Sequence, residues 1–109
     1  MERRVSCRAQ VDIPVHAYVD SFRHHCRAID LSTTGMVFER PRALEGRDLP
    51  GLQPFEIHLG LGRPLRARAR PVWSKGRLSA VRFVLMNDAD RLTIAEHLDR
   101  MVRLREPLH

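Results

Sequence analysis

The sequence predicts an all-β domain followed by a single α-helix, and two features of its pattern carry this prediction. In the first 86 residues, apolar and polar residues alternate in short segments that are separated by Gly, Pro, Ser and Asp. After residue 86 the apolar residues recur at three- and four-residue intervals instead. A period of two is typical of strands with one buried face, and a period near 3.6 is typical of amphipathic helices. The length of 109 residues and the 43% apolar fraction suit one folded domain over residues 1–109.

Three strands are predicted in the first part of the domain. Residues 11–19 alternate strictly, and Pro14 among them favours a sheet edge or a bulge. Residues 23–29 predict the second strand and residues 36–38 the third, with a Ser-Thr-Thr-Gly turn before the third. The first two strands are expected to pair, because sequential strands usually do.

Three more strands are predicted after a connecting segment. Residues 41–54 are rich in Pro, Gly and charge, which favours a loop. Alternation returns in residues 55–59, 65–73 and 78–85. Six short strands with no helix among them indicate an antiparallel sandwich or barrel.

One helix is predicted at the C-terminal end, over residues 87–104. Asn87 or Asp88 can cap its first turn, and Asp90 adds negative charge near the positive end of the helix dipole. Its apolar stripe consists of Leu92, Ala95, Leu98, Met101 and Val102. We expect this stripe to pack against the sheet or to close one end of a barrel.

Arginine carries almost all of the positive charge. Lys75 is the only lysine among 19 basic residues, and the formal net charge is +6. Codon usage in a GC-rich genome explains such a ratio, but a guanidinium also binds phosphate with paired hydrogen bonds and stacks on flat rings. Composition therefore permits a phosphate or nucleotide ligand without demonstrating one.

The chain carries no apolar signal segment at its N-terminus, and no apolar stretch approaches the roughly 20 residues that span a bilayer. We therefore expect a cytoplasmic protein without membrane insertion. In that compartment the two cysteines, Cys7 and Cys26, are expected to be reduced.

Two polar motifs flank the first predicted strand pair. Arg4-Val5-Ser6-Cys7-Arg8, directly preceded by Arg3, has the form Arg-x-x-x-Arg. Asp30-Leu31-Ser32-Thr33-Thr34-Gly35 has the form Asp-x-Ser-x-x-Gly. An up-and-back path of the two strands returns Asp30 close to Arg8, so that one site can draw on both motifs.

The chemistry of these motifs suits a guanine nucleotide. Arginine forks bind phosphate or the O6/N7 edge of guanine, and Asp30 can accept hydrogen bonds from guanine N–H groups or a ribose hydroxyl. Ser32 can donate to phosphate or to the local backbone, while Gly35 admits a positive φ and a close approach of backbone to ligand. Each motif alone also has a plainer interpretation: arginine pairs are common in this composition, and the second motif can be an Asx or Ser turn.

The order and spacing of the two motifs resemble the PilZ domain, a bacterial receptor module for the second messenger cyclic di-GMP. The resemblance covers nearly the whole chain. Residues 2–8 resemble the family's basic N-terminal segment, residues 12–15 its first strand and residues 30–35 its second signature. Val72-Trp73 and residues 80–83 resemble the later strands, and a C-terminal helix follows as it commonly does in this family.

The resemblance implies a six-stranded antiparallel β-barrel over residues 10–86. It also implies a flexible arginine-rich segment over residues 1–9 that folds over the ligand, with a C-terminal helix over residues 87–104. The implied ligand is cyclic di-GMP. Its implied site consists of Arg3, Arg4, Arg8, Asp30, Ser32 and Gly35. Arg3, just before the first motif, fits a stacked pair of cyclic di-GMP molecules.

The implied function is a receptor or adaptor that changes conformation on binding cyclic di-GMP. It would then regulate an unidentified effector protein in bacterial signalling, in motility, polarity or surface behaviour. The main alternative is a PilZ-like interaction adaptor that does not bind nucleotide. The sequence does not decide between a monomer and a homodimer.

A basic nucleic-acid-binding barrel is a weaker alternative. Arg66, Arg68 and Arg70 share one strand face, but this alternation is what a solvated exterior requires, and the chain lacks interleaved exposed aromatic residues. Trp73 is expected to anchor the core.

We predict no enzyme, no cofactor and no metal site. The sequence offers no recognisable pairing of a nucleophile with a base. His24-His25-Cys26, with Cys7 elsewhere, invites a metal site, but the four-ligand spacing of a zinc site is missing.

Overall fold

The computed structural model describes residues 8–47, 49, 51–60 and 62–105. This part of the chain contains six antiparallel strands and one α-helix, which confirms the predicted fold class. The strands are β1 (Arg8–Val19), β2 (Phe22–Ser32), β3 (Gly35–Glu39), β4 (Gln53–Ile57), β5 (Leu65–Lys75) and β6 (Leu78–Leu85). A short 3-10 turn, η1 (Arg42–Leu44), follows β3, and the C-terminal helix is α1 (Asp88–Arg105). No helix in the described part of the chain has the length and apolar character needed to cross a membrane.

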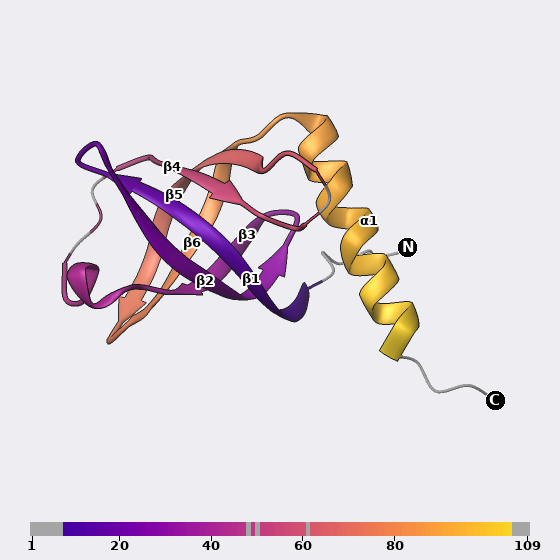
Figure 1. The fold of residues 1–109 in the computed structure, drawn as a ribbon, viewed down its shortest axis with the longest axis horizontal. Coiled ribbons are helices and arrows are strands. Elements are labelled where there is room, and N and C mark those ends of the chain that lie inside the picture. Colours follow the sequence, from indigo (N-terminus) through magenta and orange to yellow (C-terminus); the bar gives the residue numbers. More distant parts are fainter. Residues whose placement is uncertain (1–7, 48, 50, 61, 106–109) are drawn as a thin grey trace.

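The six strands form a closed barrel in the order β1-β2-β3-β6-β5-β4 (Figure 1). Two pairings between strands distant in sequence, β3 with β6 and β1 with β4, close the sheet on itself. The β1–β4 pairing is short and runs from Val15↔Ile57 to Ala17↔Phe55. Of the two architectures that the strand pattern left open, a sandwich and a barrel, the structure has the barrel.

A tight hairpin joins β1 to β2. Asp20 and Ser21, its two turn residues, have φ angles of 54° and 69°. Positive φ at both central residues is typical of the type I′ turn, whose twist matches that of paired strands. The pairing then continues along the whole of β1 as far as Arg8↔Ser32, with a bulge between Gln10 and Ile13, just before Pro14. The hairpin therefore carries Arg8 back to the end of β2.

Along most of the strands, alternate residues point into the barrel. Val15, Ala17, Phe38, Phe55 and Ile57 are at most 1% exposed, and they pack as one apolar core. In β5 the small side chains of Ala67 and Ala69 face inward and the alternating arginines, Arg66, Arg68 and Arg70, face outward, as the alternation predicts.

The expectation that Trp73 anchors the core is wrong, because Trp73 is 46% exposed. A bulge between Pro71 and Trp73 shifts the register of β5 against β6, so that Trp73 pairs with Ala80 while Val72 has no partner opposite it. One extra residue in a strand turns the following side chain to the other face.

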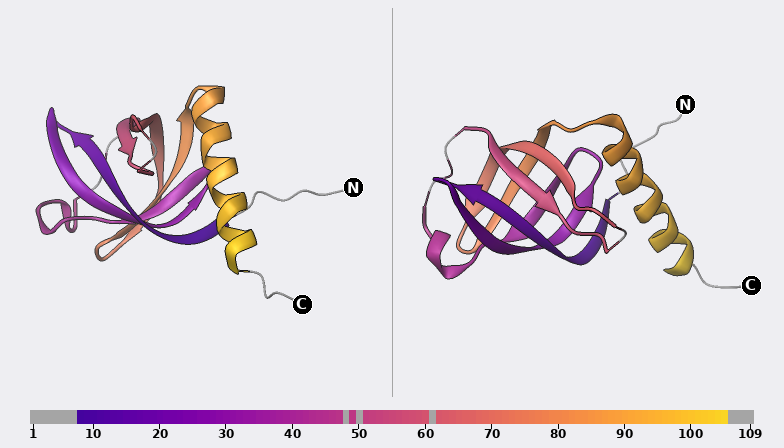
Figure 2. Two further views of the ribbon diagram at one scale, coloured as in Figure 1. Left: turned by 45° about the vertical axis from the view of Figure 1, so that its right-hand side comes forward. Right: turned by 45° about the horizontal axis from the view of Figure 1, so that its top comes forward.

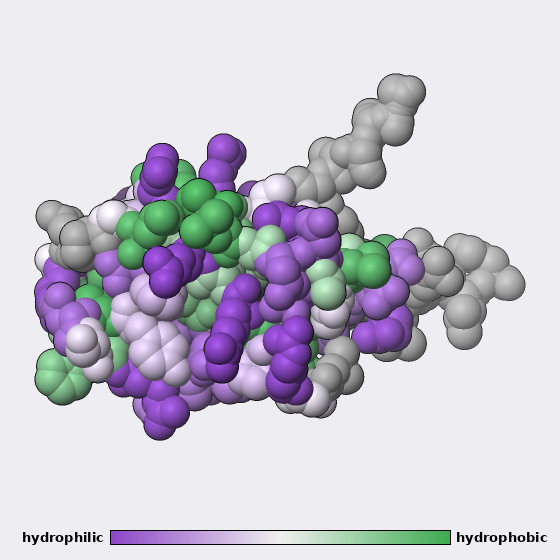
Figure 3. Space-filling model, turned by 90° about the horizontal axis from the view of Figure 1, so that it is seen from above, coloured by the Kyte–Doolittle hydropathy of each residue, from purple (hydrophilic) through white to green (hydrophobic). Residues whose placement is uncertain are grey.

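Large apolar side chains also remain on the outside. Phe22, Val72, Leu85 and Leu92 are each more than half exposed. Apolar side chains gather among polar ones on the face of the barrel seen in Figure 3.

The helix α1 lies across one end of the barrel, opposite the end that carries η1 (Figures 1 and 2). It packs against β1 and β2. Ile94 and Leu98 are fully buried in this contact and Met101 is partly buried. The predicted stripe is therefore shifted: Ile94 belongs to it, whereas Leu92 is 59% exposed and Val102 is 37% exposed.

Polar contacts fix the first turn of α1. The Asn87 side chain accepts a hydrogen bond from the Asp90 N–H at 2.7 Å, which confirms Asn87 as a cap. The Asp90 carboxylate is only 2% exposed and accepts hydrogen bonds from the Arg66 N–H and the Arg63 guanidinium, each at 3.1 Å. Asp90 therefore anchors the helix to the start of β5. Its negative charge also lies near the positive end of the helix dipole, as the sequence predicts.

Replacing Asp90 with alanine is expected to lower the free energy of unfolding by about 2–3 kcal/mol. The change leaves the Arg66 N–H and the Arg63 guanidinium without their carboxylate, and hydrogen bonds to a charged group contribute about 1.5–3 kcal/mol. Asp88→Ala is the matched control, since Asp88 is an exposed acid of the same turn. Its loss should be about 0.5 kcal/mol. Urea unfolding followed by circular dichroism measures both, and equal losses would contradict an anchoring role for Asp90.

Candidate ligand site

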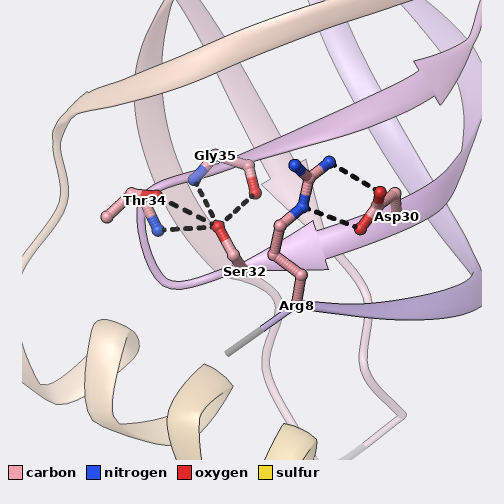
Figure 4. A network of polar contacts seen from close by, with 5 residues as sticks. All are labelled: Arg8, Asp30, Ser32, Thr34 and Gly35. Carbon is pink, nitrogen blue, oxygen red and sulfur yellow. Dashed lines mark hydrogen bonds and ion pairs between the residues drawn. The ribbon is translucent and has the colours of Figure 1, made fainter. Parts of the chain in front are cut away.

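Arg8, the last residue of the first motif, meets the second motif at the end of the barrel nearest α1 (Figure 4). The Arg8 guanidinium donates two hydrogen bonds to the Asp30 carboxylate, from Nη2 to Oδ2 at 2.6 Å and from Nε to Oδ1 at 3.4 Å (Figure 4). Arg8 is the first residue of β1, and Asp30 lies near the end of β2. The β1–β2 pairing sets this meeting, as expected from the up-and-back path of the two strands.

The ion pair is open to solvent. The Arg8 side chain is 61% exposed and the Asp30 side chain is 30% exposed. An exposed pair of this kind contributes about 0–1 kcal/mol to stability. A guanidinium has further N–H groups beyond the two that face Asp30, and they can bind an anion without breaking the pair. Asp30 thus holds the guanidinium in one orientation while leaving it accessible.

Ser32 organises the turn between β2 and β3. Its hydroxyl oxygen accepts hydrogen bonds from the Thr34 N–H at 3.1 Å and the Gly35 N–H at 3.2 Å. It also lies 3.1 Å from the Thr34 hydroxyl and 3.3 Å from the Gly35 carbonyl oxygen, and Ser32 is 5% exposed. Of the two roles open to Ser32 in the sequence, donor to a phosphate or to the local backbone, these contacts fit the second.

Gly35 allows two strands to approach each other closely. A Cβ atom at this position would lie 2.3 Å from the carbonyl oxygen of Val81 in β6. Its φ is not among the positive values, so the positive φ considered for Gly35 is not the reason for glycine here. The close approach is to backbone of β6, and the Phe83 N–H binds the Thr34 carbonyl oxygen at 2.8 Å beside it.

The structure thus brings together Arg8, Asp30, Ser32 and Gly35, four of the six residues expected in the site (Figure 4). Arg3 and Arg4 lie outside the described residues. The helix also contacts this region, because the Arg91 guanidinium donates a hydrogen bond to the Thr33 carbonyl oxygen in the turn. Arg91 was not expected from the sequence, since nothing in the helical pattern places its side chain at a turn 58 residues away.

The same outer surface continues from Asp30 across the barrel. Strand pairing places Val37 beside Asp30, Ala80 beside Val37 and Trp73 beside Ala80. Three strand spacings of about 4.8 Å separate Asp30 from Trp73, or about 14 Å. Trp73 therefore lies on the same outer face as Asp30, where its fluorescence can respond to a ligand bound there.

Cys26 is a free thiol buried in the wall of the barrel. Its side chain points into the core, where burial raises the pKa of the thiol to about 12. At that pKa the thiol stays protonated near neutral pH. This agrees with the interpretation of Cys26 as a small buried thiol, while Cys7 lies outside the described residues.

Sequence comparison agrees with the geometry. The sequence model of the PilZ domain matches residues 2–102. The chain belongs to the PilZ domain family. No curated protein sequence matches this PilZ domain.

Solved structures share the PilZ fold of the chain. The Bacillus subtilis inhibitor of motility, MotI/DgrA, aligns with a TM-score of 0.78 and 14% identity; the alignment covers 98% of this chain and 55% of MotI. The PilZ domain of YcgR from Escherichia coli, determined with c-di-GMP, aligns with a TM-score of 0.63 and 18% identity over 95% of this chain and 97% of that domain. The PilZ domain of CeSA from a cellulose-synthesizing bacterium gives a TM-score of 0.64 and 18% identity, over 87% and 97%. The chain thus spans about half of the MotI chain and nearly all of the other two domains.

Proposed function

We propose that this protein is a cyclic di-GMP receptor that changes conformation on binding the dinucleotide and regulates a partner protein in bacterial signalling. The observation that carries the proposal is that Arg8, the last residue of the first family motif, meets the second motif. Its guanidinium is held by Asp30 beside the Ser32–Gly35 turn. Cyclic di-GMP presents two phosphates and two guanine edges. An arginine fork binds either kind of group, and a carboxylate accepts guanine N–H donors.

Each part of the site has a separate task in this proposal. Asp30 orients the Arg8 guanidinium in the free protein, so that less side-chain entropy is lost on binding. Ser32 and Gly35 shape the turn between β2 and β3 beside the Arg8–Asp30 pair, and they would act on the ligand through the backbone of that turn. Arg3 and Arg4 precede β1 in the sequence and would add positive charge over the phosphates. Because Arg3 comes directly before the first motif, we include a stacked pair of ligands in the proposal.

The same proposal describes a switch rather than a catalyst. A dianionic ligand that draws the segment before β1 onto the barrel changes both shape and surface charge at that end. A partner protein that reads this change needs contact area nearby, and the exposed side chains of Val72 and Trp73 supply apolar area on the same outer face.

Direct titration tests the proposal. Calorimetry with cyclic di-GMP should give saturable binding of one molecule per chain, or two if a stacked pair forms. The fluorescence of Trp73, the only tryptophan, gives a second readout on the same samples. Cyclic di-AMP is the matched control, because it keeps the phosphates and lacks the guanine edges.

The outcomes separate the alternative functions. Absence of heat and of a fluorescence change would favour an adaptor that works through protein contacts without nucleotide. Equal binding of cyclic di-GMP and cyclic di-AMP would remove guanine recognition from the proposal. Tight binding of duplex DNA that weakens steeply with salt would favour a nucleic-acid surface instead.

A further inference from the structure

Two histidines and a glutamate form a cluster on the outer face of the barrel. His16 lies on β1 and pairs directly with Glu56 on β4, while His58 follows β4 two residues after Glu56. All three side chains are partly buried, with 15%, 19% and 32% of the His16, Glu56 and His58 side chains exposed. The cluster shares no residue with the Arg8–Asp30 site.

The three donor atoms converge with spacings suited to a tetrahedral metal ion. His16 Nδ1 lies 3.2 Å from His58 Nε2 and 3.5 Å from Glu56 Oε1, and His58 Nε2 lies 3.9 Å from the same Oε1. Zinc bonds of about 2.0–2.1 Å to nitrogen and oxygen place the ligands of a tetrahedral ion about 3.3–3.4 Å apart. The observed spacings average close to that value, so little rearrangement would be needed.

We propose that His16, Glu56 and His58 bind a divalent transition-metal ion of the zinc type, with a water molecule at the fourth position. The donor set of two imidazoles and one carboxylate favours such an ion over magnesium and calcium, which prefer oxygen ligands. An octahedral ion would require adjacent ligands about 3.0 Å apart, and all three spacings exceed this. The inference does not depend on cyclic di-GMP binding.

Neighbouring groups hold the ligands in place. Glu56 accepts a hydrogen bond from the Tyr18 side chain, and its second oxygen, Oε2, lies 3.8 Å from Arg66 Nε. The backbone N–H of His58 donates a hydrogen bond to the Pro14 carbonyl oxygen at 3.0 Å. This bond fixes the chain after β4 against β1. His25, the pairing partner of His16 on β2, packs edge-on against the His16 ring with centroids 4.6 Å apart. Outer contacts of this kind orient metal ligands and keep them available.

The location of the cluster gives the ion a structural effect. β1 and β4 close the barrel through only a short run of paired residues. An ion held by one residue of β1 and two residues at β4 would link these strands across the closing seam. Since a ligand that binds only the folded state stabilises it, zinc should raise the melting temperature in a concentration-dependent way.

Metal titration of the untagged full chain tests the inference. Chelator-treated protein titrated with zinc chloride in a calorimeter should bind one ion per chain. Cobalt(II) at the same site should give the intense visible absorption of tetrahedral coordination. His16→Gln and Glu56→Gln should each weaken zinc binding by at least about tenfold, because even loss of an outer contact to a ligand weakens metal binding by about 10–100-fold.

The control is His24→Gln, which removes a histidine of the same hairpin that does not belong to the cluster. Its zinc affinity should match that of the unaltered protein, and circular dichroism checks that all variants fold. Zinc binding that survives His16→Gln unchanged, or that falls equally in His24→Gln, would overturn the assignment. So would a folded unaltered protein that binds no zinc or shows only the weak absorption of octahedral cobalt.

Discussion

An Arg8→Ala variant is expected to lose cyclic di-GMP affinity by about 100-fold or more while keeping its fold. Arg8 is the one arginine of the first motif whose position is described, and its guanidinium is bound to Asp30 and exposed to solvent. Two charge-assisted hydrogen bonds to a phosphate or a guanine edge contribute about 1.5–3 kcal/mol each, and about 2.7 kcal/mol corresponds to 100-fold in affinity. The melting temperature should barely change, because the Arg8–Asp30 pair is exposed.

Arg27→Ala provides a closely matched control for this experiment. Arg27 is an exposed arginine of β2 that pairs with Asp12 of β1, so that it also forms an ion pair across the β1–β2 hairpin. Calorimetry should find its cyclic di-GMP affinity within about twofold of the unaltered protein, since one distant exposed charge is largely screened by salt. An equal loss in both variants would mean that the ligand senses general positive charge. Unchanged binding by a folded Arg8→Ala variant would remove Arg8 from the site.

Arg8→Lys separates the two contributions of the guanidinium. Lysine keeps the positive charge but cannot form the fork that reaches both Asp30 oxygens. A loss of cyclic di-GMP affinity close to that of Arg8→Ala would show that the geometry of the guanidinium dominates. An affinity close to that of the unaltered protein would assign the effect to charge.

Local patterns predicted the strands and the helix, and they could not predict which strands close the barrel. Period-two alternation depends only on neighbouring residues, so it shows up in the sequence. The pairings of β1 with β4 and of β3 with β6 join segments about 40 residues apart. The pattern within one strand does not indicate which distant strand it pairs with. The closed barrel came from the resemblance to the PilZ family, not from periodicity.

The wrong or missing predictions concern which side chains are buried. Trp73 follows a bulge in β5, and the inward side of the strand therefore cannot be obtained by counting from Leu65. In the helix, Leu92 fits an apolar stripe by spacing, but the barrel is contacted by the face that contains Ile94 and Leu98. The buried Arg40, which donates to the carbonyl oxygens of Arg47 and Gly76, had no signal in the sequence at all.

The two proposed sites differ in whether a local feature of the sequence predicts them. Arg8 and Asp30 were expected to meet because a single hairpin connects them, and a hairpin is a local feature. His16 and Glu56 are 40 residues apart and meet only through the closing seam of the barrel. The contiguous run from His24 to Cys26 drew attention instead, although adjacent strand residues point to opposite faces and Cys26 is buried.

Gly35→Ala is expected to lower the free energy of unfolding by about 3 kcal/mol. The added Cβ would lie 2.3 Å from the Val81 carbonyl oxygen, and that atom belongs to the backbone of β6 and cannot rotate away. Overpacking in a well-packed region costs about 1–3 kcal/mol, and a clash with backbone in a strand pair should reach the upper end. At about 4–8 °C per kcal/mol, the melting temperature should fall by more than about 10 °C.

Gly46→Ala is the control that separates this clash from the general loss of a glycine. Gly46 has a φ of +76°, and a Cβ added there would have no neighbouring atom within 4 Å. Alanine at this position therefore meets backbone strain of about 1 kcal/mol and no clash. Thermal unfolding should rank Gly35→Ala well below Gly46→Ala. If Gly35 served the ligand instead of the β3–β6 contact, Gly35→Ala would melt like the unaltered protein and lose only cyclic di-GMP binding. Measured together, melting and titration decide whether the last residue of the second motif acts on the ligand directly or by keeping β3 against β6.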